Sequence, residues 1–191
     1  MRLSRMLAAA VGLTAAASMS LATVASAQPI EKGKFHEETT EIVDDFCDVL
    51  GLTVQFDSTV DGRFLGNRHG PDGLVYFSEH LKITNVITNV ANGNAVTEEV
   101  TVLSKDLRVT DNGDGTLTIL VLATGNAVVH GSDGKAIARN PGQVRFEILI
   151  DHGGTPSDPF DDEFLEFLGL VKGSTGRTDD FCEAVVPVLL G

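Results

Sequence analysis

The middle of the chain, residues 52–151, consists of runs of β-branched and aromatic residues separated by short clusters of glycine, asparagine and aspartate. Such runs are typical of β-strands, and the clusters between them are typical of tight turns. Asn92-Gly93 is the clearest turn, because this pair adopts positive φ at little cost. Residues 111–115 and 132–135 predict two further turns. Strands joined in sequence by short turns predict an antiparallel meander.

The individual runs predict strands at residues 53–65, 74–90, 95–109, 116–129 and 144–150. We expect a bulge or bend within residues 74–90, because this run is long for one strand. Asn140-Pro141-Gly142 has proline and glycine in the order that suits a type II turn. Together with further strands expected elsewhere in the domain, the fold class is all-β, with six to eight antiparallel strands. A single antiparallel β-barrel is the leading architecture, and a β-sandwich is the alternative.

The two ends of this region are less clearly patterned. Residues 35–50 combine helical spacing of apolar residues with β-branched residues, and we interpret them as a strand. Near the C-terminus, Ser157 or Asp158 could cap a short helical segment. Phe164, Phe167, Leu168 and Val171 would then face inward. An edge strand at residues 170–173 is the alternative.

The first 27 residues have the pattern of a secretory signal peptide. Arg2 and Arg5 precede an uncharged, apolar run, which ends in the cleavage motif Ala25-Ser26-Ala27. Cleavage there would leave residues 28–191 as a single β-rich domain that is secreted and extracellular. No later segment is long and apolar enough to span a bilayer, so no membrane association is expected after cleavage.

The charge of the chain excludes some classes of partner. The formal net charge is −13 over 191 residues, and loss of Arg2 and Arg5 with the leader would make it −15. A protein this acidic is repelled by nucleic acid and by anionic membrane surfaces. We therefore expect neither as a partner, and the sequence does not predict an oligomeric state.

The tetrapeptide Asp-Asp-Phe-Cys occurs twice, at residues 44–47 and 179–182, and contains the only two cysteines. In an oxidising compartment these predict a Cys47–Cys182 disulfide that joins the two ends of the domain. Such a bridge would bring the carboxylates of both tetrapeptides close together. Those of Asp44, Asp45, Asp179 and Asp180 are weak candidates for a calcium site. Carboxylates brought together in this way most often point apart into water.

The other motifs do not identify a metal site or a catalytic site. Residues 111–115 resemble the start of an EF-hand loop, but Gly113 and Leu122 stand where oxygen ligands are needed, so we interpret them as a turn. The acidic residues from Asp158 to Glu166 are typical of a solvated face. The five histidines are scattered, and no nucleophile motif is present, so the sequence assigns no catalytic residue. Apart from calcium, no cofactor is predicted.

Four blocks of sequence resemble a family of small, uncharacterised secreted proteins of actinobacteria. They are residues 92–94, residues 106–116, residues 138–146 and residues 173–182. The resemblance covers most of the predicted mature chain and implies no activity. The expected strand arrangement is also similar in outline to lipocalin and allene oxide cyclase barrels, from which no function follows.

Three functions are compatible with these features. The leading hypothesis is that the barrel interior binds a small apolar or amphipathic ligand, because barrels of about eight strands can hold one. The first alternative is a non-enzymatic extracellular protein that acts through its acidic surface. The second is a barrel-type cyclase or isomerase. The sequence leans towards a protein that is not an enzyme.

Overall fold

The computed structural model describes residues 30–191, so the predicted signal peptide and its cleavage site lie outside the described residues. Within this range the chain forms strands, one 3-10 turn and one α-helix. In chain order they are β1 (Glu31–Val43), η1 (Phe46–Asp48), β2 (Val54–His69), β3 (Leu74–Asn89), β4 (Ala95–Asp111), β5 (Thr116–His130), β6 (Ala136–Asp151), β7 (Glu163–Lys172) and α1 (Phe181–Leu190).

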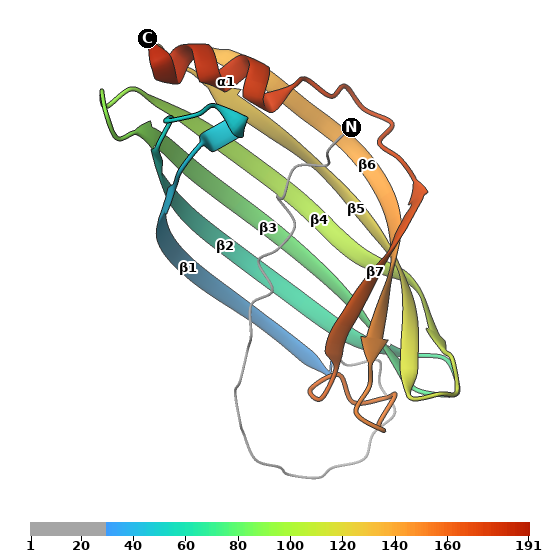
Figure 1. The fold of residues 1–191 in the computed structure, drawn as a ribbon. Coiled ribbons are helices and arrows are strands. Elements are labelled where there is room, and N and C mark those ends of the chain that lie inside the picture. The colour runs from blue at the N-terminus through green and yellow to red at the C-terminus, as the bar shows by residue number, and fades with distance from the viewer. Residues whose placement is uncertain (1–29) are drawn as a thin grey trace.

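All strands belong to one antiparallel sheet of seven strands in the order β1 to β7, as Figure 1 shows. This confirms the predicted all-β meander and its strand number. The sheet is curved but not closed, with β1 and β7 as its edges. The closed barrel therefore stays a prediction, and a single sheet argues against a sandwich.

Most predicted turns are confirmed, and one is wrong. Asn92-Gly93 joins β3 to β4, with Gly93 at φ 77°, where glycine is favoured. The turn predicted at residues 140–142 does not form, since these residues lie inside β6. Pro141 is tolerated there because β7 pairs with β6 only from Arg145 onwards, so one side of this stretch has no strand that needs its N–H.

The predicted bulge is also displaced. β3 pairs with β2 in continuous register from Val54–Asn89 to His69–Leu74, so it contains no bulge against that neighbour. A register shift occurs instead in β4, between Asp106 and Arg108, where β4 pairs with β5. A bulge of this kind turns the following part of a strand, and here it lies where β4 leaves β3.

The ends of the domain required the largest corrections. The predicted strand over residues 35–50 ends at Val43 and is followed by η1. The predicted helix after Ser157 is wrong, because residues 163–172 form β7, a longer form of the edge strand considered as the alternative. The C-terminal helix is α1, which begins after Asp180, whose carboxylate accepts a hydrogen bond from the Glu183 N–H.

The spacing of apolar residues in β7 explains why it resembled a helix. Three register shifts between β6 and β7 place Phe164, Phe167 and Leu170 opposite consecutive same-face residues of β6. A strand with a bulge at every third residue repeats its apolar positions at a spacing of three, which is close to helical spacing. Only the pairing with β6 distinguishes the two.

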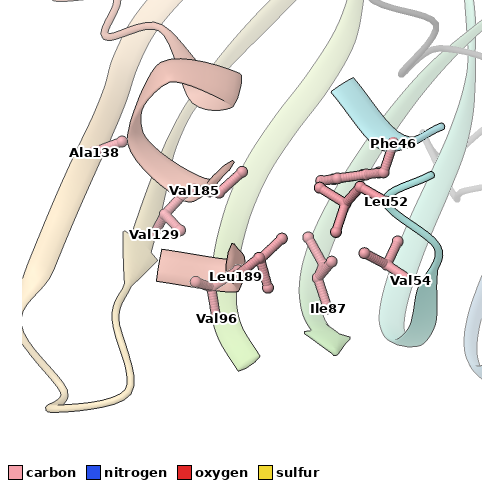
Figure 2. Close-up of a cluster of buried hydrophobic side chains, with 9 residues drawn as sticks. All are labelled: Phe46, Leu52, Val54, Ile87, Val96, Val129, Ala138, Val185 and Leu189. Carbon is pink, nitrogen blue, oxygen red and sulfur yellow. The ribbon is translucent and has the colours of Figure 1, made fainter. Parts of the chain in front are cut away.

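The largest core lies where α1 packs across one end of the sheet, at the top of Figure 1. Figure 2 shows how side chains from α1, the η1 loop and five strands meet there. The cluster consists of Phe46, Leu52, Val54, Ile87, Val96, Val129, Ala138, Val185 and Leu189. Leu189 and Val185 are completely buried, so α1 closes this end of the sheet.

A smaller core lies further along the sheet, in β4, β5 and β6. It consists of Val109, Leu117, Ile119, Val121 and Ile150. None of the helices in residues 30–191 is long and apolar enough to cross a membrane.

Candidate functional site: a hollow on the inner face of the sheet

The two faces of the sheet differ in burial. We call the face that contacts α1 the inner face, since it carries Ile87, Val96 and Val129. Along β4, inner residues such as Val102 are half-buried, while outer residues such as Thr101 are exposed. The inner face beyond α1 is therefore sheltered but not fully covered.

Glycines on β1 and β2 let aromatic rings lie flat on this face. The Phe35 ring lies over Gly62, and the Phe64 ring lies over Gly33. A Cβ atom at either glycine would overlap the ring, so these positions require glycine. The pairing of Gly33 with Phe64 and of Phe35 with Gly62 places both contacts across the β1–β2 ladder.

A hollow of about 340 Å³ opens on the inner face beside the point where β3 and β4 separate. The β3–β4 ladder ends at the pair Ser78–Lys105, and the strands diverge beyond it. The apolar lining consists of Phe64, Phe77, Val121, Phe146 and Ile148. The polar lining consists of Glu79, Ser104, Lys105 and Asp106. Strands β2 to β6 all contribute.

Asp106 bridges the gap between the separating strands. Its Oδ2 accepts a hydrogen bond of 2.7 Å from the Phe77 N–H, which has no backbone partner once the ladder has ended. Burial raises the pKa of Asp106 to about 6, although the Phe77 N–H acts in the opposite direction. Burial also raises the pKa of Glu79, which faces the same hollow from β3.

A second polar pair lies on the inner face closer to α1. Asn85 Nδ2 donates a hydrogen bond of 2.8 Å to Glu98 Oε2, and both residues are buried, with 8% and 6% of their surface exposed. The Asn85 Oδ1 is buried and has no hydrogen-bond partner. A buried acceptor without a partner is costly, and it would be satisfied by a donor.

The strand register separates charge between the two faces. On β1 to β6, every lysine and arginine except Arg68 lies on the outer face. Arg68 stands near the far end of β2, where its guanidinium donates to the Ser157 carbonyl. The acidic residues of the inner face are Glu31, Glu37, Glu41, Glu79, Glu98, Asp106 and Asp111.

The predicted disulfide is present. Cys47 is bonded to Cys182, with 5.6 Å between the two Cα atoms, and it joins the η1 loop to α1. The loop has unusual backbone geometry, since Asp45, Cys47 and Asp48 all have φ between 49° and 60°. The bridge and the burial of Phe46 hold these residues in a conformation that L-residues rarely adopt.

The four candidate metal carboxylates each have a partner of their own. Asp44 accepts from the Thr53 hydroxyl and Asp45 from the Gly51 N–H. Asp179 pairs with Arg177, which lowers its pKa, and accepts from the Arg139 N–H. Asp180 caps α1. In the part of the chain that the structure describes, no group of three or more His, Cys, Asp or Glu residues is arranged to hold a metal ion.

The acidic loop before β7 does not gather into one site either. Asp158 accepts from the Phe160 N–H and Asp161 from the Thr155 hydroxyl. Burial raises the pKa of Asp162 to about 6, assisted by the charge of Asp161. Asp162 Oδ1 and Nδ1 of the nearby His152 are both buried without a hydrogen-bond partner.

Sequence reasoning did not find the residues of the hollow. Glu79, Ser104 and Asp106 were interpreted only as members of strands. Their alternation with outward residues was a usable signal, because Ser104 and Asp106 continue the inward-facing positions of Val100 and Val102 but are polar. The separation of β3 from β4, which makes the hollow, has no comparable signal.

No family model matches this chain, and no curated protein or solved structure matches it either. The function therefore has to be argued from the site itself.

Proposed function

We propose that the protein binds a small apolar or amphipathic ligand on the inner face of the sheet. The hollow lined by aromatic and aliphatic side chains carries this proposal, because ligand sites are typically concave, mainly apolar and equipped with a few polar groups. A closed barrel is not required, since β2 to β6 already line the hollow.

The neighbouring strand β7 extends the apolar surface. The rings of Phe146, in the hollow, and Phe167, on β7, have centroids 5.6 Å apart. Phe164, Phe167 and Leu170 remain 48–56% exposed, which is unusual for three large apolar side chains on one strand. A ligand seated in the hollow could cover part of this surface.

Binding of the neutral fluorescent probe N-phenyl-1-naphthylamine tests the proposal. We expect its fluorescence to rise on binding and the variant Ser104→Phe, which fills the hollow, to weaken binding by about tenfold. Thr101→Phe is the matched control, because this exposed residue lies on the outer face of the same strand. Absence of binding to the wild-type protein, or equal effects of both variants, would contradict the proposal.

We further propose that the protein acts outside the cell. The disulfide supports this, since structural disulfides persist in oxidising compartments. Intact mass of the protein from culture supernatant should correspond to a chain that begins at Gln28. A mass that includes Arg2 and Arg5 would contradict it. The acidic-surface and isomerase alternatives stay predictions, and no particular contact favours either.

A further inference from the structure

We propose that the ligand is a cationic amphiphile, whose protonated amine lies between Glu79 and Asp106 and whose apolar tail follows the inner face towards α1. This inference rests on the proposed function, since it assumes that the hollow binds an apolar ligand and specifies the charge of that ligand.

The polar groups at the hollow select for a hydrogen-bond donor with positive charge. Glu79 and Asp106 face it from β3 and β4, and a carboxylate can only accept hydrogen bonds. The Ser104 hydroxyl lies beside them and can also accept. Lys105 borders the hollow, but it is exposed and stands on the outward-facing side of β4, opposite Leu122.

The carboxylates are also poorly compensated by the protein itself. The hydrogen bond from the Phe77 N–H is the only one that Asp106 receives among the described residues. Partial burial without a cationic partner keeps the pKa of both carboxyl groups above the ordinary range. An ammonium ion placed between them would supply the missing charge and up to three donors.

The charges of the whole inner face also favour a cationic ligand. Its charged residues on β1 to β6 are acidic except for Arg68, whereas lysines and arginines occupy the outer face. A fatty acid or another anionic amphiphile would meet like charge at every charged position of this face except Arg68. A cationic one would meet charges that complement its own.

The inner face beyond the hollow suits an apolar tail. Between Glu79 and the buried Asn85–Glu98 pair, β3 presents Leu81 and Ile83 inward, and β4 presents Val100 and Val102. The stretch of β3 from Glu79 to Asn85 is about 20 Å long. The Asn85 Oδ1 at its far end is a buried acceptor without a partner, so it offers a second position for a donor.

Titration calorimetry with three ligands of equal tail length tests the proposal: decylamine, decanol and decanoate at pH 7.5, below their aggregation concentrations. We expect decylamine to bind about tenfold more tightly than decanol, and decanoate to bind most weakly. In the variant E79Q/D106N the preference for the amine should fall below about twofold, while decanol binding persists.

The exposed Glu99 on the outer face of β4 provides the matched control. Glu99→Gln removes an acidic charge from the same strand and should leave the preference unchanged. The Asn introduced by D106N can still accept from the Phe77 N–H, so the variant should fold, and its melting temperature checks this.

A second measurement needs no variant. Amide chemical shifts of Glu79, Ser104 and Asp106 should respond to decylamine more strongly than those of Thr101 and Glu99. If amine and alcohol bind equally, or if decanoate binds best, the charge inference is overturned and the proposed function survives. If the shifts concentrate on the outer face, or if none of the three ligands binds, both fail.

Discussion

The two ends of the inner face differ in how their apolar surface is covered. At one end α1 and the η1 loop pack on the sheet, and Leu189, Val185, Val54 and Ile87 have no exposed surface. At the other end none of residues 30–191 forms a helix over the sheet, and the inner face opens into the hollow beside Glu79 and Asp106. The apolar side chains of the packed end are fully enclosed, whereas those of the hollow end stay partly open.

The disulfide should have the largest effect on the packed end. Replacing Cys47 and Cys182 by serine removes a link between residues 135 positions apart. We expect the free energy of unfolding to fall by about 4–5 kcal/mol, from the chain entropy gained by the unfolded state. Urea denaturation measures this. A loss below about 1 kcal/mol would show that the ends hold together without the bridge.

Two substitutions that shorten a side chain compare the two ends of the inner face directly. Leu189→Ala empties a fully buried position and should cost about 3 kcal/mol. Ile148→Ala, at the half-buried wall of the hollow, should cost about half as much, because that side chain is not fully enclosed. Both are measured by denaturation at fixed pH. Equal losses would show that the hollow end is packed as tightly as the end under α1.

The carboxyl groups of the hollow predict a pH dependence. The pKa of Asp106 is about 6 in the folded protein against an ordinary value of 3.8, so the folded state binds this proton more tightly than the unfolded chain. The free energy of unfolding should therefore fall as the pH rises from about 4 to about 7, by at most about 3 kcal/mol for this group. The raised pKa of Glu79 acts in the same direction.

The substitution Asp106→Asn should remove most of this fall in the free energy of unfolding between pH 4 and pH 7. Melting temperatures of the wild-type protein and the variant between pH 4 and pH 7 provide the comparison, since the contribution of Asp162 is common to both. Parallel pH profiles would mean that Asp106 titrates normally and that the hollow does not desolvate it.

Calcium should have the smallest effect. Asp44, Asp45, Asp179 and Asp180 are each engaged by a separate partner near the disulfide, so we expect calcium to raise the melting temperature no more than sodium chloride of equal ionic strength. A calcium-specific increase that is lost in the variant Asp45→Asn/Asp180→Asn would instead establish a metal site at the packed end.

Some of this architecture could be predicted from sequence because it depends on local chemistry. The Asn92-Gly93 turn follows from the conformational freedom of two adjacent residues. The disulfide followed from having two cysteines and no other possible partner. The strands of residues 54–151 followed from β-branched runs. Pro141 suggested a turn, but it lies inside β6, in a stretch with which β7 does not pair.

The candidate site depended on tertiary structure. A period of two in a strand defines two faces, but it does not say which face α1 will cover, so the sequence alone could not assign Glu79 and Asp106 to an interior. The register shift after Asp106 and the separation of β3 from β4 arise from pairing between strands. The pKa of Asp106 depends on both, because burial raises it.

The sequence by itself determined the meander, its turns and the covalent link between its ends, since each is set by residues that are adjacent or unique. Only the tertiary structure decided that residues 163–172 form a bulged edge strand rather than a helix, because both have apolar residues at similar spacing and pairing with β6 favours the strand. It also decided which face is sheltered and acidic, because that depends on where α1 packs.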